Sequence, residues 1–224
     1  MPTEPADTPI LRVPLDAIDV AEEIVAEGGT LSAGWLLAGY RSGIFPMPHV
    51  DDEGETRLFW YWPLERGQLP LNGFVASRSL RSAMRRHTIR VDTEFEQVLV
   101  ACARADDPEH LWLSAAFADT YRELHALGWA HSVEAWTLNG QLAGGVLGVE
   151  IGGLFSGDTM VSFLTNGSKV ALAGAIELLN SDPRDRIFDT QWLTPHLASL
   201  GGVEVSRAEY ARQLERALRR DPLL

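Results

Sequence analysis

Cysteine is almost missing from this sequence of 224 residues, and Cys102 is its single example. No internal disulfide can therefore form. Without a Cys-x-x-Cys pair, and with only six scattered histidines, a structural zinc site is not expected. His125, His131 and His196 have no ligand spacing on a common helix face, so we interpret them as packing or hydrogen-bonding residues.

Long apolar runs are also missing. The longest stretches fall far short of the roughly 20 residues that a membrane-spanning helix needs. The first thirty residues lack the basic start and apolar run of a secretory signal. We therefore expect a cytoplasmic protein that does not bind a membrane. The hydrophobic content of 46% suits one or two soluble domains with a large core.

Basic residues are few, with 19 Lys and Arg against 31 Asp and Glu and a net charge of −12. This balance argues against a protein that coats nucleic acid nonspecifically, because phosphate contacts need Lys and Arg. A local basic patch remains possible, since Arg78, Arg81 and Arg85 recur at the spacing of one helix face. That stripe is either a candidate nucleic-acid contact or a solvated helix face. The acidic excess suits a basic partner.

The first half of the chain predicts an extended tail over residues 1–15, where four prolines occur, followed by short helices. The first of these helices is expected to end at Gly43. An apolar segment broken by prolines follows at 44–48. The residues expected to begin helices in the whole chain are Thr30, Ser77, Thr93 with Glu96, Ser114, Ser168 and Ser206 with Glu209.

The second half predicts strands at 133–137, 141–149 and 154–160, with a hairpin at Asn139-Gly140. A helix from Ser168 and a strand at 186–193 complete a β-β-β-α-β order. This order predicts an α+β fold like that of N-acetyltransferases, with a mixed, mostly antiparallel sheet. We expect that acyltransferase-like domain at 76–224. A smaller α/β N-terminal domain with the tail is expected at 1–75.

Several short motifs resemble one family. Residues 39–48, GYRSGIFPMP, are similar to the Tyr-x-x-Gly-Ile-Phe-Pro motif of the leucyl/phenylalanyl-tRNA–protein transferases. Residues 125–134, HALGWAHSVE, resemble that family's His-x-Leu-Gly-x-Ala-His-Ser-x-Glu run. The motifs that follow in the family's order are 144–149, 168–172, 189–191 and 198–201. Together they span roughly residues 30 to 210.

The resemblance implies an aminoacyltransferase that moves leucine or phenylalanine, with methionine as a further candidate, from aminoacyl-tRNA to acceptor proteins. The acceptors would begin with Arg or Lys and would be marked for degradation through the N-end rule. No metal, ATP or coenzyme A is expected, because the aminoacyl ester already stores the energy for peptide-bond formation. The resemblance further implies a monomer, and makes the stripe of Arg78, Arg81 and Arg85 a candidate tRNA contact.

Asp189 and Gln191 are the candidate catalytic pair. On a strand, residues two apart lie on one face, so the carboxylate can orient the amide and the amide can steer the attacking amine. A neutral amide is a poor base, which favours positioning and charge stabilisation over proton transfer. Taken alone, the pair favours the solvent face of an edge strand. The neighbouring motifs favour catalysis.

Aromatic residues are candidates for the tRNA end. Trp112 corresponds to the family's tryptophan that stacks on the terminal adenine, although a core position between two leucines is the commoner fate of such a residue. The family's Trp-Trp-x-Pro is Trp60-Tyr61-Trp62-Pro63 here. We favour Tyr61 or Trp60 as the aromatic that lines the site.

The aminoacyl side chain needs an apolar pocket, for which the resemblance gives Val146, Phe155, Met160 and Val170. Ordinary sheet core is the alternative for each. Asp158 stands where the family has glutamate, and it is expected to face the aminoacyl-adenosine unless it is only a turn residue. The segment that follows it, 161–165, is atypical of the family. The carboxylates considered for the acceptor's basic N-terminus are Glu150, Asp158 and Asp189.

Two other functions remain open. A coenzyme A-dependent N-acetyltransferase would need a glycine-rich pyrophosphate loop, whereas residues 165–169 read TNGSK. A tRNA 3′-end-binding protein with a decayed catalytic centre is favoured only by the atypical segment. The presence of Asp189 and Gln191 opposes that second alternative.

Overall fold

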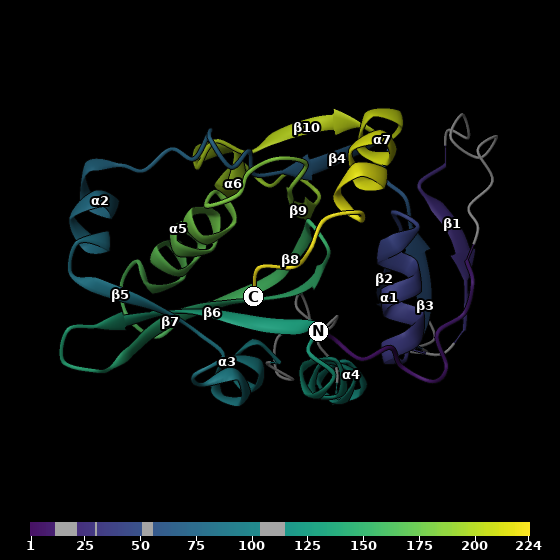
Figure 1. Cartoon of the computed structure of the whole chain (residues 1–224), viewed down its shortest axis with the longest axis horizontal. Helices are drawn as coiled ribbons and strands as arrows, with labels where there is room; N and C mark the ends of the chain where they lie inside the picture. Colours follow the sequence, from purple (N-terminus) through teal and green to yellow (C-terminus); the bar gives the residue numbers. More distant parts are fainter. Residues whose placement is uncertain (12–21, 30, 51–55, 104–114) are drawn as a thin grey trace.

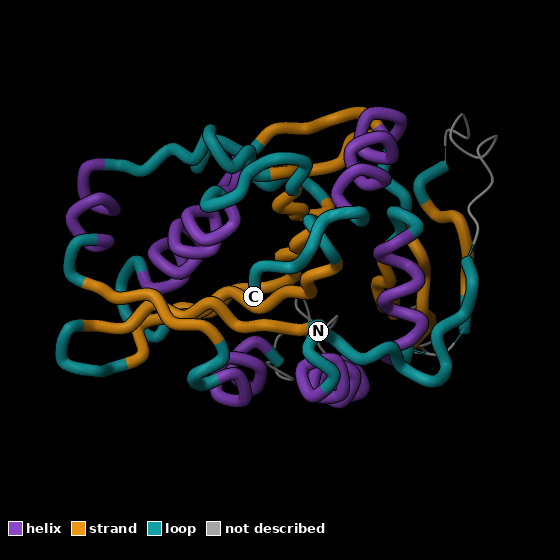
Figure 2. Tube along the Cα trace, viewed as in Figure 1, coloured by secondary structure: helices purple, strands orange, loops and turns teal. Residues whose placement is uncertain are grey.

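The structure is a computed structural model that describes residues 1–11, 22–29, 31–50, 56–103 and 115–224. Its strands form a smaller and a larger sheet, with helices packed around them (Figures 1 and 2). The smaller sheet has the order β1-β3-β2, from the strands β1 (Ile24–Glu27), β2 (Phe45–Val50) and β3 (Thr56–Tyr61). In the described part of the chain, no helix is long and apolar enough to cross a bilayer.

The larger sheet has the order β10-β4-β9-β8-β7-β6-β5. Its strands are β4 (Glu65–Gln68), β5 (His87–Val91), β6 (Ala130–Thr137), β7 (Leu142–Ile151), β8 (Leu154–Ser162), β9 (Ile187–Gln191) and β10 (Val203–Ser206). β6, β7 and β8 form an antiparallel meander, and β9 pairs parallel to β8 and antiparallel to β4. The expected mixed, mostly antiparallel sheet is confirmed. The expected division of the chain at residue 75 stays a prediction.

Helices cover both faces of the larger sheet. The connection from β8 to β9 is α5 (Gly167–Leu179), which packs on β6 and β7. On the opposite face lie α3 (Phe95–Cys102) and α4 (Ala115–Ala126), as Figure 1 shows. Every residue of β7 is buried as a result. A strand covered on both sides reads as a continuous small and apolar run, which explains the sequence LAGGVLGVEI.

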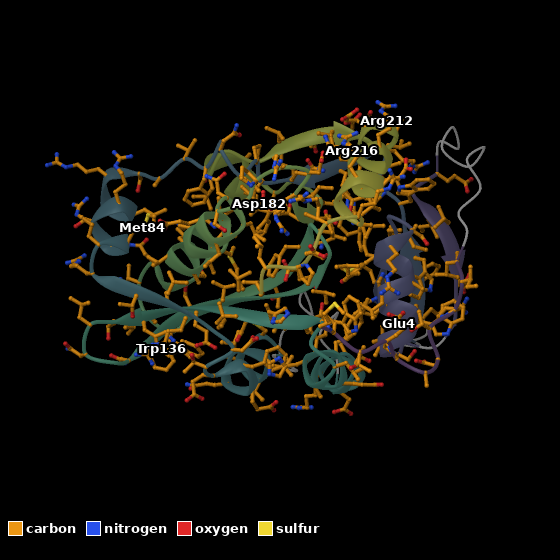
Figure 3. The ribbon with its side chains drawn as sticks, viewed as in Figure 1. Glu4, Met84, Trp136, Asp182, Arg212 and Arg216 are labelled. Carbon is orange, nitrogen blue, oxygen red and sulfur yellow. The ribbon has the colours of Figure 1, made fainter. Side chains whose placement is uncertain are left out.

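The remaining helices lie at the two ends of the larger sheet. They are α1 (Ala33–Arg41), α2 (Arg78–Met84), α6 (Pro195–Ser199) and α7 (Arg207–Ala217). The N-terminal segment lies against α1 and α4. Glu4, labelled in Figure 3, pairs with Arg41 of α1, and the indole of Trp129 donates to the carbonyl of Thr3 at 2.7 Å. The described part of the expected tail is therefore tied to the domain.

Several helix starts differ from the sequence prediction. Ser77 and Ser206 cap α2 and α7 as expected, but Ser32 caps α1, and Thr30 and Ser114 lie outside the described residues. The expected capping box at Thr93 is wrong, because the N-cap of α3 is Glu94, without a side-chain cap, and the Thr93 hydroxyl donates to the carbonyl of Val91 at 3.5 Å.

The expected start of α5 at Ser168 is also wrong. The helix begins at Gly167, which follows Asn166 in the left-handed region at φ 66°. A Cβ at Gly167 would lie 1.7 Å from the carbonyl oxygen of Ala143, so this close approach of helix to strand requires glycine. Tertiary packing sets this helix start, and the nearby serine does not.

Candidate active site

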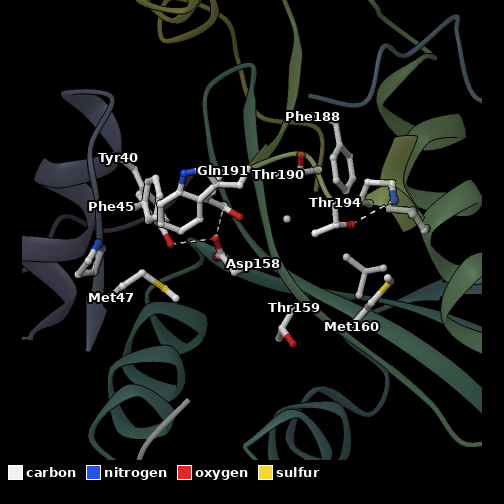
Figure 4. A pocket seen from close by; sticks show the side chains of 16 residues that line it. Tyr40, Phe45, Met47, Asp158, Thr159, Met160, Phe188, Thr190, Gln191 and Thr194 are labelled. Atoms are coloured by element: carbon white, nitrogen blue, oxygen red, sulfur yellow. Dashed lines mark hydrogen bonds between the residues drawn. The ribbon is translucent and has the colours of Figure 1, made fainter. Parts of the chain in front are cut away.

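A cavity of about 300 Å³ opens where the smaller sheet and α1 meet β8 and β9. Tyr40 and Phe45 lie on one side of it, and Met160 and Phe188 lie on the other (Figure 4). Its lining is mostly apolar, which suits a hydrophobic side chain. Among the described residues, Asp158 is the one carboxylate that lines it. The remaining lining side chains include Met47, Val146, Thr159, Leu172, Thr190, Gln191, Trp192, Thr194 and Leu197.

Asp158 is the acceptor at the centre of a hydrogen-bond network. Its Oδ1 atom accepts from the hydroxyls of Tyr40 at 2.9 Å and Ser156 at 2.7 Å, and from Gln191 Nε2 at 3.0 Å. Its Oδ2 atom accepts from the hydroxyl of Tyr121. No Lys or Arg among the described residues forms an ion pair with Asp158. The alternative that Asp158 is only a turn residue is excluded, because it lies within β8.

Burial shifts the pKa of the Asp158 carboxyl group. It raises the pKa of Asp158 from 3.8 to about 7, although the hydrogen bonds from Tyr121, Ser156 and Tyr40 oppose the shift. Burial and the Asp158 charge also raise the pKa of both tyrosines well above 10, so they stay protonated donors. The cavity wall thus holds a carboxyl group that changes charge near neutral pH.

Gln191 ends β9 in an unusual backbone conformation. Its φ is +60°, which is uncommon for a residue with a side chain. The pairing of β4 with β9 is irregular here, and Gly67 lies opposite Gln191. A Cβ at Gly67 would lie 2.5 Å from the carbonyl carbon of Trp192, so only glycine lets the chain turn this closely. Irregular pairing of this kind re-aims side chains beside active sites.

The side-chain amide of Gln191 has a defined direction. Its Nε2 atom donates to Ser156 Oγ at 2.8 Å and to Asp158 Oδ1 at 3.0 Å. Flipping the amide would turn its oxygen toward the carboxylate, which is unfavourable. The Oε1 atom has no hydrogen-bond partner among the described residues and remains available as an acceptor. The site can therefore receive an N–H donor at Gln191.

Asp189 lies behind Gln191 and is only 1% exposed. Its carboxylate accepts from Arg66 Nε at 2.8 Å and NH2 at 2.5 Å, and from the hydroxyl of Tyr210 at 2.8 Å. It also accepts from the backbone N–H of Gln191 at 2.9 Å. The solvent face of an edge strand is excluded, since β9 lies between β4 and β8. Asp189 thus fixes the backbone of Gln191, while Ser156 and Asp158 fix its amide.

Comparison with known proteins identifies the family. The family model "Leucyl/phenylalanyl-tRNA protein transferase" matches residues 68–215, and the model of that family's N-terminal domain matches 29–64. The chain belongs to the leucyl/phenylalanyl-tRNA–protein transferase family. The expected family and the expected enzyme class are confirmed.

Individual relatives of this transferase family agree. The leucyl/phenylalanyl-tRNA–protein transferase of Ruegeria sp. (strain TM1040) is 47% identical over 84% of this chain and 88% of its own. That of Herpetosiphon aurantiacus is 44% identical over 84% of this chain and 95% of its own. A solved structure titled "Tandem GNAT protein from the clavulanic acid biosynthesis pathway (without AcCoA)" covers 83% of this chain and 62% of that one. It has 16% sequence identity and a TM-score of 0.35, a similarity too weak to bear on the site.

The apolar residues that the transferase resemblance assigned to the pocket fall into two groups. Val146 and Met160 line the cavity. Phe155 and Val170 are buried in the core cluster that contains Val146. Phe155 packs against Phe188, a lining residue, with ring centroids 5.2 Å apart. Phe155 therefore supports the cavity wall from behind, and Val170 belongs to the same buried cluster.

Trp60 and Tyr61 differ in how close they lie to the cavity. Trp60 is buried in a separate cluster and donates its indole N–H to the carbonyl of Gly28 at 3.1 Å. Tyr61 packs against Phe45 and Trp192, both of which line the cavity, with centroids 6.0 and 5.2 Å away. Tyr61 is therefore the nearer of the two to the cavity, although neither lines it. Trp112 lies outside the described residues.

Arg78, Arg81 and Arg85 are exposed on and at the end of α2. This helix lies at the opposite end of the larger sheet from α1 and β2, which flank the cavity (Figure 1). The structure therefore does not bring this stripe together with the predicted catalytic pair. A ligand that contacts both would have to extend along the larger sheet, as a tRNA could.

Other polar residues have structural partners. Glu150 accepts the backbone N–H groups of Leu223 and Leu224 at 2.8 and 2.9 Å, so it is not free to bind an acceptor. His131 Nδ1 lies 2.7 Å from Asp92 Oδ2, and His125 stacks on Phe95. No group of three or more His, Cys, Asp or Glu side chains that could hold a metal ion occurs in the described ranges.

Sequence reasoning missed Tyr40, Tyr121, Ser156, Arg66 and Tyr210. Tyr40 begins the matched motif Tyr-x-x-Gly-Ile-Phe-Pro, so a signal for it was present. The other four residues lie outside the family motifs in the sequence. They enter the site through contacts between segments far apart in sequence, such as the 123 positions that separate Arg66 from Asp189.

Proposed function

We propose that this chain transfers leucine or phenylalanine from aminoacyl-tRNA to the N-terminal Arg or Lys of acceptor proteins. Family membership supplies the donor class and the use of protein acceptors. The main structural support is the Gln191 amide, which is held with its oxygen free beside an apolar cavity. The cytoplasmic location, the monomeric state and the methionine option remain predictions.

The cavity suits the aminoacyl side chain of the donor. Val146 and Met160 line it together with Phe45 and Leu172. A flexible, polarizable methionine can adapt to side chains of different shape, as leucine and phenylalanine require. Phe155 and Val170 act as supporting residues in this proposal. Tyr61 stabilises the aromatic wall by packing against Phe45, whereas Trp60 is buried in its separate cluster.

The reaction joins the acceptor's α-amino nitrogen to the ester carbonyl carbon of the donor. The neutral amine attacks, and the bond from that carbon to the ribose oxygen breaks. Gln191 Oε1 accepts an N–H of the amine and aligns its lone pair with the carbonyl. Asp158 takes up the proton that nitrogen loses, since its pKa of about 7 suits proton transfer at neutral pH. The same proton can then neutralise the departing ribose oxygen.

Asp189 contributes without touching the substrate in this proposal. It is buried and fully hydrogen-bonded, and it holds Gln191 through the backbone. Of the carboxylates considered for the acceptor's basic N-terminus, Asp158 alone is free of an ion pair among the described residues and lines the cavity. Trp112 is proposed to stack on the terminal adenine, and Arg78, Arg81 and Arg85 to contact the tRNA backbone.

The two alternatives are less well supported. An N-acetyltransferase would need a pyrophosphate loop before α5, where Asn166 in the left-handed region precedes Gly167 without the required glycine pattern. A binding protein with a decayed centre would not need Asp189 and Gln191 held by so many hydrogen bonds.

A transfer assay tests the proposal. The purified chain is incubated with tRNA charged with radiolabelled leucine and a peptide that begins with Arg. Label is expected in this peptide, but not in the same peptide with an acetylated N-terminus or an N-terminal Asp. Labelled acetyl-coenzyme A replaces the tRNA in a parallel reaction. Acetylation of the peptide without leucine transfer would favour the N-acetyltransferase, and donor binding without any transfer would favour the binding protein.

A further inference from the structure

Arg66 occupies the centre of a buried junction. It lies on β4, is 1% exposed, and holds the Asp189 carboxylate with two of its nitrogens. Its third nitrogen, NH1, donates to the carbonyl of Gly43 at 2.9 Å. The guanidinium lies between two rings, 4.7 Å from the Phe45 centroid and 4.5 Å from that of Tyr210. Lysine cannot reproduce such a planar fork of donors.

The charges at this junction are balanced. Burial alone would lower the pKa of Arg66, but the negative charge of Asp189 overcomes it, and the net shift is upward. Burial raises the pKa of Tyr210, so its hydroxyl stays a donor to Asp189. A buried carboxylate is costly unless it is paired and hydrogen-bonded, and Arg66 with Tyr210 meets both needs.

The same carboxylate holds the strained end of β9. Asp189 Oδ1, which accepts from Arg66 Nε, also accepts the backbone N–H of Gln191. Gln191 has a φ of +60°, a conformation that persists in non-glycine residues only when the surroundings enforce it. If Asp189 moved or rotated, this hydrogen bond would break and the Gln191 side chain would lose its direction.

We propose that Arg66 and Tyr210 are positioning residues that act through Asp189 to aim Gln191 at the acceptor's amine. This inference rests on the proposed function for its catalytic consequence. Its geometric part is that Arg66 and Tyr210 hold the backbone of Gln191 through Asp189, and this part does not depend on the proposed function. Arg66 also donates to the carbonyl of Gly43, which lies in the turn between α1 and β2. These two elements carry the cavity residues Tyr40 and Phe45. The Arg66 side chain thereby fixes the position of the cavity wall relative to the Gln191 amide.

Tyr210→Phe and Arg66→Lys test the inference in the full chain. Tyr210→Phe removes one donor and keeps the ring, and it should lower kcat roughly tenfold with little change in the KM for leucyl-tRNA. Arg66→Lys should lower kcat further, roughly a hundredfold. Arg207→Lys is the matched control. Arg207 is another buried arginine next to β10, and it donates to the carbonyls of Trp62 and Pro63 rather than to Asp189. This control should keep its kcat even if its melting temperature falls.

A double-mutant cycle separates positioning from general stability. In the Gln191→Ala background, Tyr210→Phe should cause no further decrease in the single-turnover rate, because the residue through which it acts is gone. Equal decreases from Tyr210→Phe in the wild-type and Gln191→Ala backgrounds would overturn the inference. Wild-type rates in both Tyr210→Phe and Arg66→Lys would also overturn it.

Hydrogen exchange tests the geometric part without any assay of activity. The amide of Gln191 should exchange roughly tenfold faster or more in Tyr210→Phe than in wild type, and at the wild-type rate in Arg207→Lys. The same exchange rates are expected even if the chain fails to transfer leucine. That failure would contradict the proposed function but not the positioning role. Unchanged exchange at Gln191 in Tyr210→Phe and in Arg66→Lys would overturn the positioning role.

Discussion

Gln191 donates its side-chain amide to Asp158 across 3.0 Å, although the two residues are 33 positions apart in the chain. Ser156 lies beside this contact, accepting from Gln191 and donating to Asp158. The side-chain amide nitrogen of Gln191 is engaged by Ser156 and Asp158, so the amide oxygen is left without a hydrogen-bond partner among the described residues. The direction of this small network defines what the cavity can bind.

Ser156→Ala should loosen the direction of the amide. Gln191 would keep one of its two acceptors, so the effect should be partial. We expect the kcat/KM for the acceptor peptide to fall about tenfold, since one hydrogen bond to a charged network is worth roughly 1.5 kcal/mol. Ser162→Ala, on the same strand but hydrogen-bonded to Ser168, is the control. A kcat/KM of Ser156→Ala within about twofold of that of the control would show that Asp158 alone suffices to orient the Gln191 amide.

The raised pKa of Asp158 predicts a pH-dependent stability. Since the pKa rises from 3.8 to about 7 on folding, the folded state holds this proton more tightly between those values. The contribution is fully present below about pH 4 and is lost as the pH rises through about 7. Asp158→Asn should therefore gain unfolding free energy relative to wild type between about pH 4.5 and about pH 8, by at most about 4 kcal/mol. Urea titrations at both pH values would measure this difference, and a constant difference would contradict it.

The positive φ of Gln191 predicts that its conformation costs stability. Gln191→Gly should be more stable than Gln191→Ala by roughly 1 kcal/mol, because glycine adopts φ +60° without strain. Both variants lose the amide, so both should transfer leucine at a similarly reduced rate. Chemical denaturation of the two proteins gives the comparison. If Gln191→Ala were the more stable variant, the strain assigned to this residue would be wrong.

The exposed arginines of α2 predict a salt-dependent interaction with tRNA. Arg78→Ala, Arg81→Ala and Arg85→Ala combined should weaken the binding of whole leucyl-tRNA, and should leave that of an aminoacyl-adenosine fragment unchanged. The slope of log K against log salt should fall by about 0.9 for each duplex phosphate that the arginines no longer neutralise. Arg216→Ala, an exposed arginine of α7 paired with Asp185, is the control. An unchanged slope would leave α2 as a solvated helix face.

Local chemistry in the sequence predicted much of the fold. Asn139-Gly140 marks the β6–β7 hairpin, where Gly140 has a φ of +78°. Ser77 and Ser206 cap their helices with the expected hydrogen bonds. These signals succeed because turn and cap geometry depends on a few neighbouring residues.

Several strands were not predicted from the sequence, among them the three shortest, β1, β4 and β10. Each has only four residues, and β4 reads ERGQ, without apolar alternation. Its side chains serve the site instead, because Arg66 binds Asp189 and Gly67 makes room for the turn at Gln191. A strand whose composition is set by such contacts gives no period-two signal.

The predicted catalytic pair lay in a recognisable motif, but its arrangement did not follow from strand periodicity. Asp189 and Gln191 were expected to share a face, with the carboxylate orienting the amide. The left-handed φ of Gln191 instead sends the amide toward Asp158, and Asp189 binds the backbone. Distant partners such as Tyr210 could not be found, since their role depends on contacts that only the folded chain makes.

Gln191 positions the attacking amine in the proposed reaction, and a single-turnover transfer assay measures this role. Wild type and Gln191→Ala, each in excess over radiolabelled leucyl-tRNA, are mixed with saturating Arg-initiated peptide, and the rate of peptide-bond formation is measured. The predicted result is a rate roughly a hundredfold lower or more in Gln191→Ala, with equal binding of leucyl-tRNA by the two proteins. Equal rates in the two proteins would show that Gln191 does not position the amine.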